Sequence, residues 1–264
     1  MTLLIETVQE GVAVLTMNRP EQRNAFSEEM AEALLNSLER VALDPQIGCV
    51  ILTGAGAAFS AGGDVVAMAA AVKRAQDISI DRASTSLRRF MECSRLLHDM
   101  PKPTIAALPG AAAGAGLSMA LACDLRIAAA GAKIVTAFAR IGLSGDFGGT
   151  YFLSRLVGTA KARELYYFSE TLLAEEAISL GVVNKVVRGD ALMDSAMTWA
   201  RQLADGPRVA LAAMKRNFNL AEQGRLDFVL DQEALLHTQC VRTADHAEAA
   251  AAFVESRAPR FVGA

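Results

Sequence analysis

Two short apolar segments, residues 49–54 and 104–108, have the pattern of buried strands, and each is followed by a loop of glycine and alanine. These loops, residues 57–64 and 110–116, run into expected helices. Backbone N–H groups at the start of a helix lack partners inside it and lie at the positive end of its dipole. Because small residues let an oxygen atom come close, two such loops across one cleft would form an oxyanion hole. Tight turns and close helix packing explain either loop taken alone without any function.

The other segments alternate between strand and helix. Ser27 is expected to cap a helix that ends at Asp44-Pro45. The further expected elements are a hairpin over 3–17, a broken helical region over 65–100, a helix start over 117–123, a strand over 124–129, helices over 149–169 and 174–179, and a strand over 182–187. This order predicts an α/β fold. Beyond Leu192 all segments are expected to be helical, so we divide the chain into a core, 1–191, and a C-terminal helical region, 192–264.

The composition provides enough apolar residues for a packed core, since 52% of the 264 residues are hydrophobic. The formal net charge of −3 argues against a broad nucleic-acid-binding surface, and no nucleic-acid partner is expected. The four cysteines lie far apart without a CxxC pair, so we expect buried thiols in a reducing compartment. They are Cys49, Cys93, Cys123 and Cys240.

One uncharged stretch, residues 104–123, is long enough to span a bilayer. It is mostly alanine and glycine, and Pro109-Gly110 interrupts it, so we expect a buried strand, turn and helix instead. The N-terminus has two early acidic residues and no basic region followed by an apolar stretch, which argues against a secretory signal. We therefore expect a soluble, cytoplasmic protein without a membrane span.

Other functions that use glycine loops fit the sequence less well. Residues 110–116 have the spacing G-x-x-x-G-x-G, not the G-x-G-x-x-G of a dinucleotide site, and the sequence has no Gly-Lys-Ser/Thr for a P-loop. Ser118 lies in a segment that approaches a nucleophile elbow but has alanine at the second glycine position. The three histidines lie on expected helices without an evident carboxylate partner. Because no ligand residues have suitable spacing, no metal site is expected.

A series of short motifs runs along nearly the whole chain. The motifs are Met17-Asn18-Arg19-Pro20, Arg23-Asn24-Ala25, Phe59-Ser60-Ala61-Gly62-Gly63-Asp64, Pro101-Lys102-Pro103, the loop 110–116, Ala122-Cys123-Asp124, Gly148-Gly149-Thr150, Gly181-Val182-Val183-Asn184 and residues 253–261. In this order they resemble the crotonase (enoyl-CoA hydratase/isomerase) family.

The resemblance implies a crotonase-like α/β fold, a spiral of ββα units with a C-terminal helical trimerisation region, assembled as a homotrimer or a dimer of trimers. It implies an acyl-CoA substrate, with coenzyme A as part of that substrate and no separate cofactor. The oxyanion hole would use the backbone N–H groups of Ala61 and Ala115. The residues that the resemblance places along the substrate and CoA track are Arg23, Ala25, Ser60, Gly62, Asp64, Gly114, Ser118 and Phe138.

One departure from the family pattern bears on the reaction. Hydratases of the family use two glutamates, and their positions hold Ser118 and Phe138 here, neither of which can act as a base. Asp146, just before the paired glycines 148 and 149, instead resembles the single aspartate of some isomerases of the family. The alternative role of Asp146 is an N-cap for the helix that follows.

Asp146 leads to one main hypothesis and two alternatives. In the main hypothesis the protein is a 3-enoyl-CoA isomerase, and Asp146 moves a proton from C2 to C4 through a stabilised enolate. Apolar neighbours such as Phe138 and Phe147 are expected to raise the pKa of its carboxyl group. The first alternative is a hydratase or hydrolase of the same family. The second is a non-catalytic CoA-binding or scaffold protein. The acyl group is not evident from the sequence.

Overall fold

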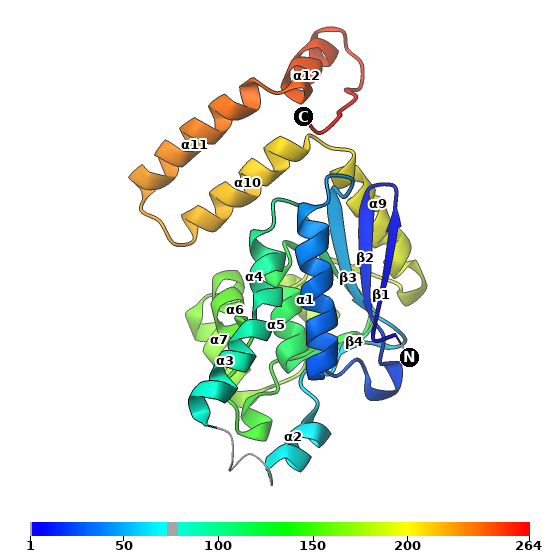
Figure 1. Cartoon of the computed structure of the whole chain (residues 1–264), viewed down its shortest axis with the longest axis vertical. Helices are drawn as coiled ribbons and strands as arrows, with labels where there is room; N and C mark the ends of the chain where they lie inside the picture. The colour runs from blue at the N-terminus through cyan, green and yellow to red at the C-terminus, as the bar shows by residue number, and fades with distance from the viewer. Residues whose placement is uncertain (1, 73–78) are drawn as a thin grey trace.

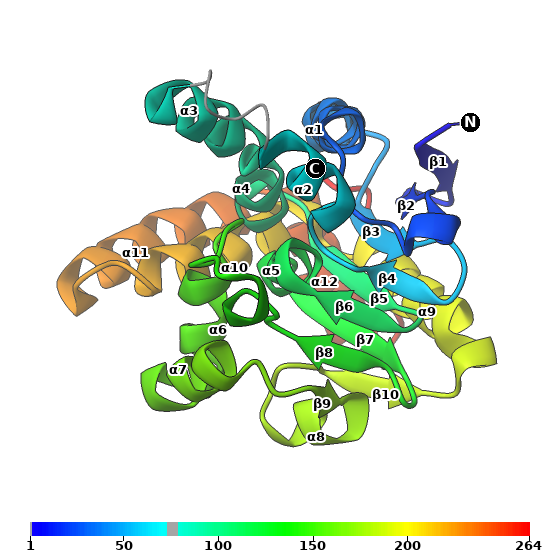
Figure 2. The same cartoon turned by 90° about the horizontal axis from the view of Figure 1, so that it is seen from below.

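Two sheets form the centre of the protein, and the computed structural model describes residues 2–72 and 79–264. The larger sheet has the strand order β1 (Leu4–Gln9), β2 (Val12–Met17), β3 (Cys49–Gly54), β5 (Thr104–Leu108), β7 (Leu125–Ala129) and β10 (Lys185–Val187). The smaller sheet has the order β4 (Ala58–Ser60), β6 (Ala111–Ala113), β8 (Lys133–Val135) and β9 (Leu172–Leu173). Figure 2 shows the strands of the smaller sheet beneath the larger one.

Helices surround both sheets (Figure 1). The α-helices of the described residues are α1 (Glu28–Leu43), α2 (Val65–Val72), α3 (Ile80–Phe90), α4 (Glu92–Asp99), α5 (Gly114–Ala122), α6 (Gly149–Val157), α7 (Thr159–Phe168), α8 (Ala174–Ser179), α9 (Leu192–Ala204), α10 (Arg208–Ala221), α11 (Leu226–Val241) and α12 (Ala244–Val254). Short 3-10 helices are η1 (Pro20–Gln22), η3 (Ala139–Ile141) and η4 (Gly189–Ala191).

The chain repeatedly places one strand in each sheet before it forms a helix. β3 precedes β4 and α2, β5 precedes β6 and α5, and β7 precedes β8, after which α6 and α7 follow. Strands β2, β3, β5, β7 and β10 pair in parallel, and so do β4, β6 and β8. This arrangement confirms the predicted α/β spiral of ββα units.

Strand β3 is buried on both faces because helices cover the larger sheet on both sides. Its alternate residues enter two separate apolar clusters: Val50 and Leu52 face the cluster that includes α1, α4 and α5, while Cys49 and Ile51 face α9. β5 alternates in the same way. A strand covered on both faces has a continuous apolar sequence, which explains why these segments were recognised as strands.

Helix α9 belongs to this packed core. Its residues Leu192, Ala196, Ala200 and Ala204 are buried at a spacing of four and lie against the larger sheet. The predicted division after residue 191 stays a prediction, but it separates α9 from the sheet that α9 covers.

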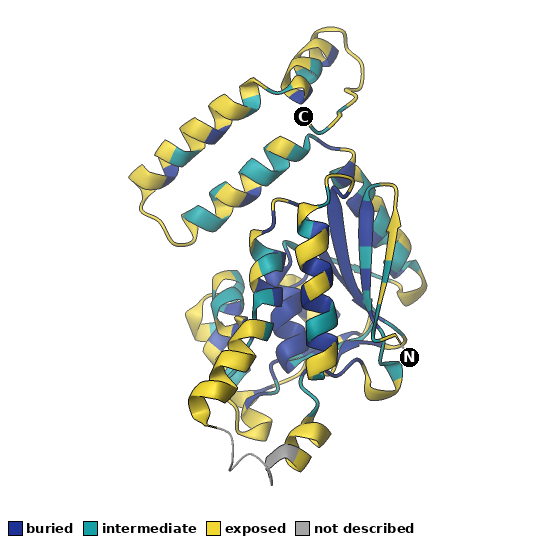
Figure 3. Ribbon diagram, viewed as in Figure 1, coloured by how far each residue is buried: buried dark blue, intermediate teal, exposed yellow. Residues whose placement is uncertain are grey.

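Helices α10, α11 and α12 extend away from the sheets (Figure 1). The buried ammonium group of Lys215 on α10 attaches them to the core: it donates to the carbonyl oxygens of Leu97 at 2.8 Å and Lys102 at 3.0 Å, and to the Asp124 carboxylate at 2.9 Å. Figure 3 shows that much of the surface of these three helices is exposed. Large apolar side chains are part of that surface, including Phe218, Leu226, Phe253 and Val254.

Most predicted elements are present. The hairpin over 3–17 forms β1 and β2, and Ser27 caps α1 by accepting from the N–H of Met30 at 3.2 Å. Residues 104–123 form the predicted strand, β5, and the predicted helix, α5, while the expected turn between them contains the short strand β6. In the region 65–100, residues 73–78 lie outside the described residues. Within the described ranges, no helix is long and apolar enough to cross a membrane.

Some elements differ from the prediction. The helix predicted over 149–169 is two helices, α6 and α7, separated at Gly158, whose φ of 76° favours glycine. Strand β10 is shorter than the predicted 182–187. The four strands of the smaller sheet were read as loops or not recognised, because strands of two or three residues give no alternating pattern.

Candidate active site

The parallel pairing of β4 with β6 brings the two glycine loops together. Ala58 pairs with Ala111, and the chains then reach Gly62 and Gly114. Gly62 has a φ of 85°, and a Cβ added to it would lie 2.7 Å from the carbonyl oxygen of Ala113. Only glycine fits this position, because both the backbone angle and the close approach exclude a side chain.

The first loop contains an N–H group, that of Gly63, without an acceptor among the described residues. The N–H of Ala61 donates to the carbonyl oxygen of Arg23 at 2.9 Å, and that of Gly62 donates to Ser60 Oγ at 3.1 Å. Among the hydrogen bonds of the described residues, none uses the N–H of Gly63. The prediction of Ala61 as an oxyanion donor is therefore wrong, since its N–H is already engaged. Gly63, which sequence reasoning missed, is the available donor of this loop.

The second loop contains Ala115, the other predicted donor, and its role as a donor stays a prediction. Ala115 is the second residue of α5, so its N–H has no acceptor within the helix, and no side chain caps the helix start. A Cβ on Gly62 would lie 3.3 Å from this nitrogen, which places the two loops in direct contact. A Cβ on Gly114 would lie 3.9 Å from the Cα of Gly62. The N–H groups of Gly63 and Ala115 thus come from two loops that meet.

Ser60 stabilises the first loop from inside. Its side chain is fully buried, and Oγ donates to the carbonyl oxygen of Asn24 at 2.8 Å while accepting from Gly62 N–H. Asn24 is also fully buried and donates to the carbonyl oxygens of Ala55 and Ala58. The hydroxyl of Ser60 is thus engaged with the backbone, and the predicted contact of this residue with substrate stays a prediction.

Asp64 starts helix α2. Its carboxylate accepts from the N–H of Ala67 at 3.0 Å and pairs with Arg19 at 3.2 Å. The Ala67 hydrogen bond and the nearby Arg19 hold the pKa of Asp64 below its usual value. Arg23 is exposed and Ala25 is buried beside it. The predicted contacts of these residues with CoA are not tested by these geometries, but the Asp64 carboxylate already has protein partners.

Asp146 lies in a loop whose backbone is unusual. Gly145 has a φ of 113°, Phe147 of 48° and Gly148 of 77°. The N-cap of α6 is Gly148, and no side chain caps this helix, so Asp146 does not act as the N-cap. A buried, left-handed Phe147 is strained, and such strain concentrates at functional sites.

The carboxyl group of Asp146 has the environment of a base. Its Oδ1 atom is buried and has no hydrogen-bond partner among the described residues. Burial raises the pKa of Asp146 to about 6, because a charged carboxylate is poorly solvated there. An uncompensated buried carboxyl with a raised pKa marks a candidate functional group.

Aromatic rings and one serine surround this loop. Phe138 is buried and stacks on Tyr166, with ring centroids 5.8 Å apart, and Phe147 packs near Phe26 at 6.0 Å. Ser118 is buried, and its hydroxyl donates to the carbonyl oxygen of Gly114 at 3.2 Å. Ser118 and Phe138 therefore lie on this side of the site, where neither supplies a carboxylate.

Tyr166 was not recognised from the sequence. A Cβ added at Gly149 would collide with both the Tyr166 hydroxyl and Ser118 Oγ, and a Cβ at Gly145 would lie 3.1 Å from the Tyr166 ring. The Tyr166 side chain thus packs against the loop that carries Asp146, next to Gly145 and Gly149. Its sequence context, Leu-Tyr-Tyr-Phe on a helix, gives no signal that distinguishes it from a packing residue.

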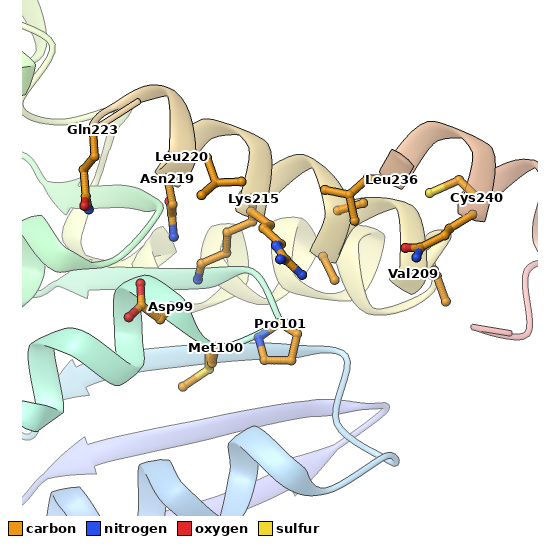
Figure 4. A pocket seen from close by; sticks show the side chains of 14 residues that line it. Asp99, Met100, Pro101, Val209, Lys215, Asn219, Leu220, Gln223, Leu236 and Cys240 are labelled. Atoms are coloured by element: carbon orange, nitrogen blue, oxygen red, sulfur yellow. The ribbon is translucent and has the colours of Figure 1, made fainter. Parts of the chain in front are cut away.

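A separate open groove of about 570 Å³ lies between α10, α11 and the end of α4 (Figure 4). Its lining includes Met100, Pro101, Leu220, Leu236 and Cys240. None of the loop residues around Asp146 lines it. Within the described parts of the chain, no group of three His, Cys, Asp or Glu side chains is placed to hold a metal ion.

Two backbone N–H groups on loops that meet, together with a buried carboxyl group without a hydrogen-bond partner among the described residues, suit a site that polarises a carbonyl group and moves a proton. Residues 7–264 match the family described as enoyl-CoA hydratase/isomerase, and the chain belongs to this family of CoA-thioester enzymes.

Known relatives carry both activities in their names. The chain is 39% identical to the 1,2-epoxyphenylacetyl-CoA isomerase of Escherichia coli (strain K12), over 100% of this chain and 99% of the relative. It is 34% identical to a short-chain-enoyl-CoA hydratase of Clostridium acetobutylicum, over 94% of each. The crystal structure of an enoyl-CoA hydratase from Polaromonas sp. JS666 superposes with a TM-score of 0.91 at 33% identity, covering 97% of this chain and 98% of that one.

Proposed function

We propose that the protein is an acyl-CoA isomerase that converts a 3-enoyl-CoA to a 2-enoyl-CoA. The observation that carries this proposal is the unpartnered, buried carboxyl of Asp146, whose pKa is raised to about 6. Hydratases that this chain resembles have two glutamates in the site. The corresponding positions here hold Ser118 and Phe138. A site with one carboxylate favours a reaction in which one base removes and returns a proton.

In the proposed reaction, the thioester oxygen binds between the N–H groups of Gly63 and Ala115. These donors stabilise the negative charge that develops on this oxygen, which lowers the barrier to removal of the C2 proton. Asp146 takes that proton as the C2–H electron pair moves into the enolate. The enolate then takes the same proton at C4, the double bond shifts from C3 to C2, and Asp146 is a carboxylate again. A pKa near 6 keeps Asp146 ionised at neutral pH and makes it a stronger base than an ordinary aspartate.

The surroundings of Asp146 favour a flat or cyclic acyl group. The rings of Phe138, Phe147 and Tyr166 lie near the carboxyl-bearing loop. The isomerase name of the Escherichia coli relative, which includes a phenylacetyl group, agrees with this expectation.

Hydration is the second candidate, because other relatives are named hydratases. A water molecule activated by Asp146 would add across the double bond of a 2-enoyl-CoA. The two candidates give different products: isomerisation leaves the mass unchanged, whereas hydration adds one water.

We also propose that the reaction needs no cofactor beyond the CoA carried by the substrate, and that the protein assembles as a homotrimer or a dimer of trimers. The exposed apolar residues of α10 to α12, among them Phe218 and Phe253, support the assembly because an isolated chain would leave them in water. Sedimentation equilibrium would give the number of chains.

The central test is the fate of the C2 proton. A 3-enoyl-CoA deuterated at C2 is incubated with the protein in ordinary water, and the product is analysed by mass spectrometry and NMR. We expect a 2-enoyl-CoA without added water and with deuterium partly retained at C4, since a single buried carboxyl carries the label. A hydrated product without any isomer would contradict isomerisation. Thermal stabilisation by CoA without turnover of any enoyl-CoA would indicate a non-catalytic protein instead.

A further inference from the structure

The peptide group between Gly62 and Gly63 carries the proposed donor of the first loop. Its carbonyl oxygen, that of Gly62, accepts from the N–H of Phe26 at 2.7 Å. Because this peptide group is trans and planar, its N–H points away from Phe26. Two successive glycines have little conformational preference of their own, so the direction of this N–H depends on the contacts that hold the loop.

Ser60 holds the preceding peptide group, between Ala61 and Gly62. Its side chain is fully buried at the end of β4, and its Oγ accepts from the N–H of Gly62 at 3.1 Å. The same hydroxyl donates its only proton to the carbonyl oxygen of Asn24 at 2.8 Å. Because that proton is used, a lone pair of the oxygen remains for Gly62. The hydroxyl therefore cannot rotate without losing one of these two hydrogen bonds.

An irregularity in strand pairing directs the Ser60 side chain inward. Ala58 pairs with Ala111 and Ser60 pairs with Ala112, so two steps along β4 match one step along β6. Such an irregularity changes the direction of a side chain at a strand end. Residues 58–60 are accordingly all buried, without the alternation of a regular strand.

Asn24 gives the Ser60 hydroxyl a fixed acceptor. Asn24 is fully buried and has a left-handed φ of 55°, which asparagine tolerates better than most residues. Its Oδ1 accepts from the N–H of Arg19 at 2.9 Å. Its side-chain amide donates to the carbonyl oxygens of Ala55 at 3.0 Å and Ala58 at 2.8 Å. Three side-chain hydrogen bonds thus hold the residue whose carbonyl group binds Ser60.

Ser60 also contacts the second loop. A Cβ added at Gly116 would lie 2.5 Å from Ser60 Cβ and 2.7 Å from Ser60 Oγ. Gly116 follows the proposed donor Ala115 in the first turn of α5. The start of this helix therefore packs directly on Ser60, and one buried side chain contacts both loops.

We propose that Ser60 is a positioning residue of the oxyanion hole: its hydroxyl holds the first loop, and its contact with Gly116 sets the distance to the second. The N–H groups of Gly63 and Ala115 then keep one arrangement while charge develops on the thioester oxygen. Donors that are fixed in advance stabilise this charge without reorganisation. The inference rests on the proposed function, in which these two N–H groups bind that oxygen.

Ser60→Ala removes the hydroxyl and keeps the Cβ that packs on Gly116. The N–H of Gly62 loses its acceptor, so we expect the loop to shift until this buried group finds another partner. Because the donors act mainly in the transition state, kcat for a 3-enoyl-CoA should fall about tenfold, while KM changes by less than about twofold. Ser60→Cys retains a weak acceptor, so its loss of kcat should be smaller. It also provides the test if Ser60→Ala does not fold.

Thr53→Val is the matched control. Thr53 is buried on β3, and its hydroxyl also donates to a backbone carbonyl oxygen, that of Ala107, at 2.9 Å. We expect Thr53→Val to lower the unfolding temperature as Ser60→Ala does, and to keep the kcat of the parent. Equal losses of kcat in these two variants would indicate a general disturbance and would overturn the inference.

Infrared spectroscopy of a bound ligand tests the donors without turnover. The probe is phenylacetyl-CoA with ¹³C at its thioester carbonyl, which has no alkene in its acyl chain. Hydrogen bonds from two N–H groups weaken the C=O bond, so binding to the parent should lower its stretching frequency. In Ser60→Ala we expect about half of this shift, because one of the two donors is displaced. Thr53→Val should show the full shift.

A full frequency shift in Ser60→Ala would overturn the inference, even with a lower kcat, because the loss would then arise elsewhere. Equal losses of kcat in Ser60→Ala and Ser60→Cys would also overturn it. The proposed function is tested separately, by the parent: no shift at saturating phenylacetyl-CoA would contradict the two donors themselves. A normal shift in the parent that persists in Ser60→Ala keeps the donors and removes only the role of Ser60.

Discussion

The two sides of the active site are built in different ways. On the donor side, a Cβ added at Gly62 would lie 2.7 Å from the carbonyl oxygen of Ala113, a backbone atom fixed by strand pairing. On the carboxylate side, a Cβ added at Gly149 would collide with the side chains of Ser118 and Tyr166. A strand cannot move without breaking its sheet, whereas a side chain is replaced by one substitution. The donor side is a rigid frame, and the carboxylate side is the part that can vary.

This difference separates what a family shares from what a member does. Polarisation of a thioester carbonyl needs only backbone N–H groups, which any residue except proline supplies. The position and number of carboxylates decide where protons move. Relatives named isomerase and hydratase are similar to this chain over nearly its whole length, which is consistent with a shared frame and an exchangeable side.

The largest expected effect is at the carboxylate itself. Asp146→Asn removes the proposed base, and we expect turnover of a 3-enoyl-CoA to fall about 10³-fold. The folded protein favours the neutral carboxyl, because its pKa is raised from 3.8 to about 6, so ionisation costs stability as the pH rises through this range. At pH 7 the variant should therefore be more stable, by roughly 1 kcal/mol after allowance for partial solvation. Initial rates and thermal unfolding at pH 7 measure both effects.

Asp205→Asn is the matched control for this substitution, because Asp205 is exposed at the end of α9. It should change neither the rate nor the unfolding temperature. Turnover of Asp146→Asn within tenfold of the parent would contradict the assignment of the base.

The next effect tests the rigidity of the donor side. Gly62→Ala places a Cβ against a backbone oxygen and forces a φ of 85° on a residue with a side chain. We expect displacement of one donor to reduce kcat/KM about 10²-fold. The strain should also lower the free energy of unfolding by roughly 1–2 kcal/mol.

Gly131→Ala provides the control for strain without collision. Gly131 has a similar φ of 73°, but a Cβ there would have nothing within 4 Å. It should lose comparable backbone stability and keep its activity. Equal activity losses in the two variants would show that strain, not the donor geometry, explains the effect.

The pH dependence of kcat/KM also distinguishes the two sides, because only the carboxylate side contains a group expected to titrate. Backbone N–H groups do not titrate near neutrality, so the only expected ionisation on the acid side is that of Asp146. Below its pKa of about 6 the base is protonated, and kcat/KM should fall tenfold for each further pH unit. A profile measured between pH 4.5 and 8 that shows a second acidic group would indicate a two-carboxylate mechanism.

The smallest effect is expected from Gly149→Ala on the carboxylate side. The new Cβ meets side chains that can shift, and alanine favours the start of α6 by about 1 kcal/mol over glycine. The unfolding temperature should therefore change little, while displacement of Tyr166 reduces kcat/KM by about tenfold. A loss of stability as large as that of Gly62→Ala would contradict the proposed difference between the two sides.

The structure of the donor side was easier to predict from the sequence than that of the carboxylate side. Buried strands such as β3 and the capped helix α1 have strong local patterns, and the glycine loops follow them directly. The donor of the first loop was misplaced by two residues, since the use of Ala61 N–H by Arg23 depends on a contact between distant segments. No local pattern reports which N–H remains free.

On the carboxylate side, Asp146 was found through resemblance, and its raised pKa agrees with the prediction. Tyr166 was missed because its importance arises from packing against a loop about twenty residues away, which a helical tyrosine does not reveal. The smaller sheet was missed for a similar reason. Its strands are short and are stabilised only by partners far along the chain.

The parallel pairing of the larger sheet has a consequence for how the chain folds. Apart from the β1–β2 hairpin, each pairing joins distant segments: Val50 pairs with Thr104, and Ile127 with Lys185. Contacts between distant segments form slowly, because a long loop must lose conformational entropy on closing before the stabilising contact forms. During synthesis the oxyanion loops can meet once α5 has emerged, whereas the Lys215 tether must wait for α10. The two loops that carry the proposed donors can therefore meet first, and the last helices then attach to a core that is already formed.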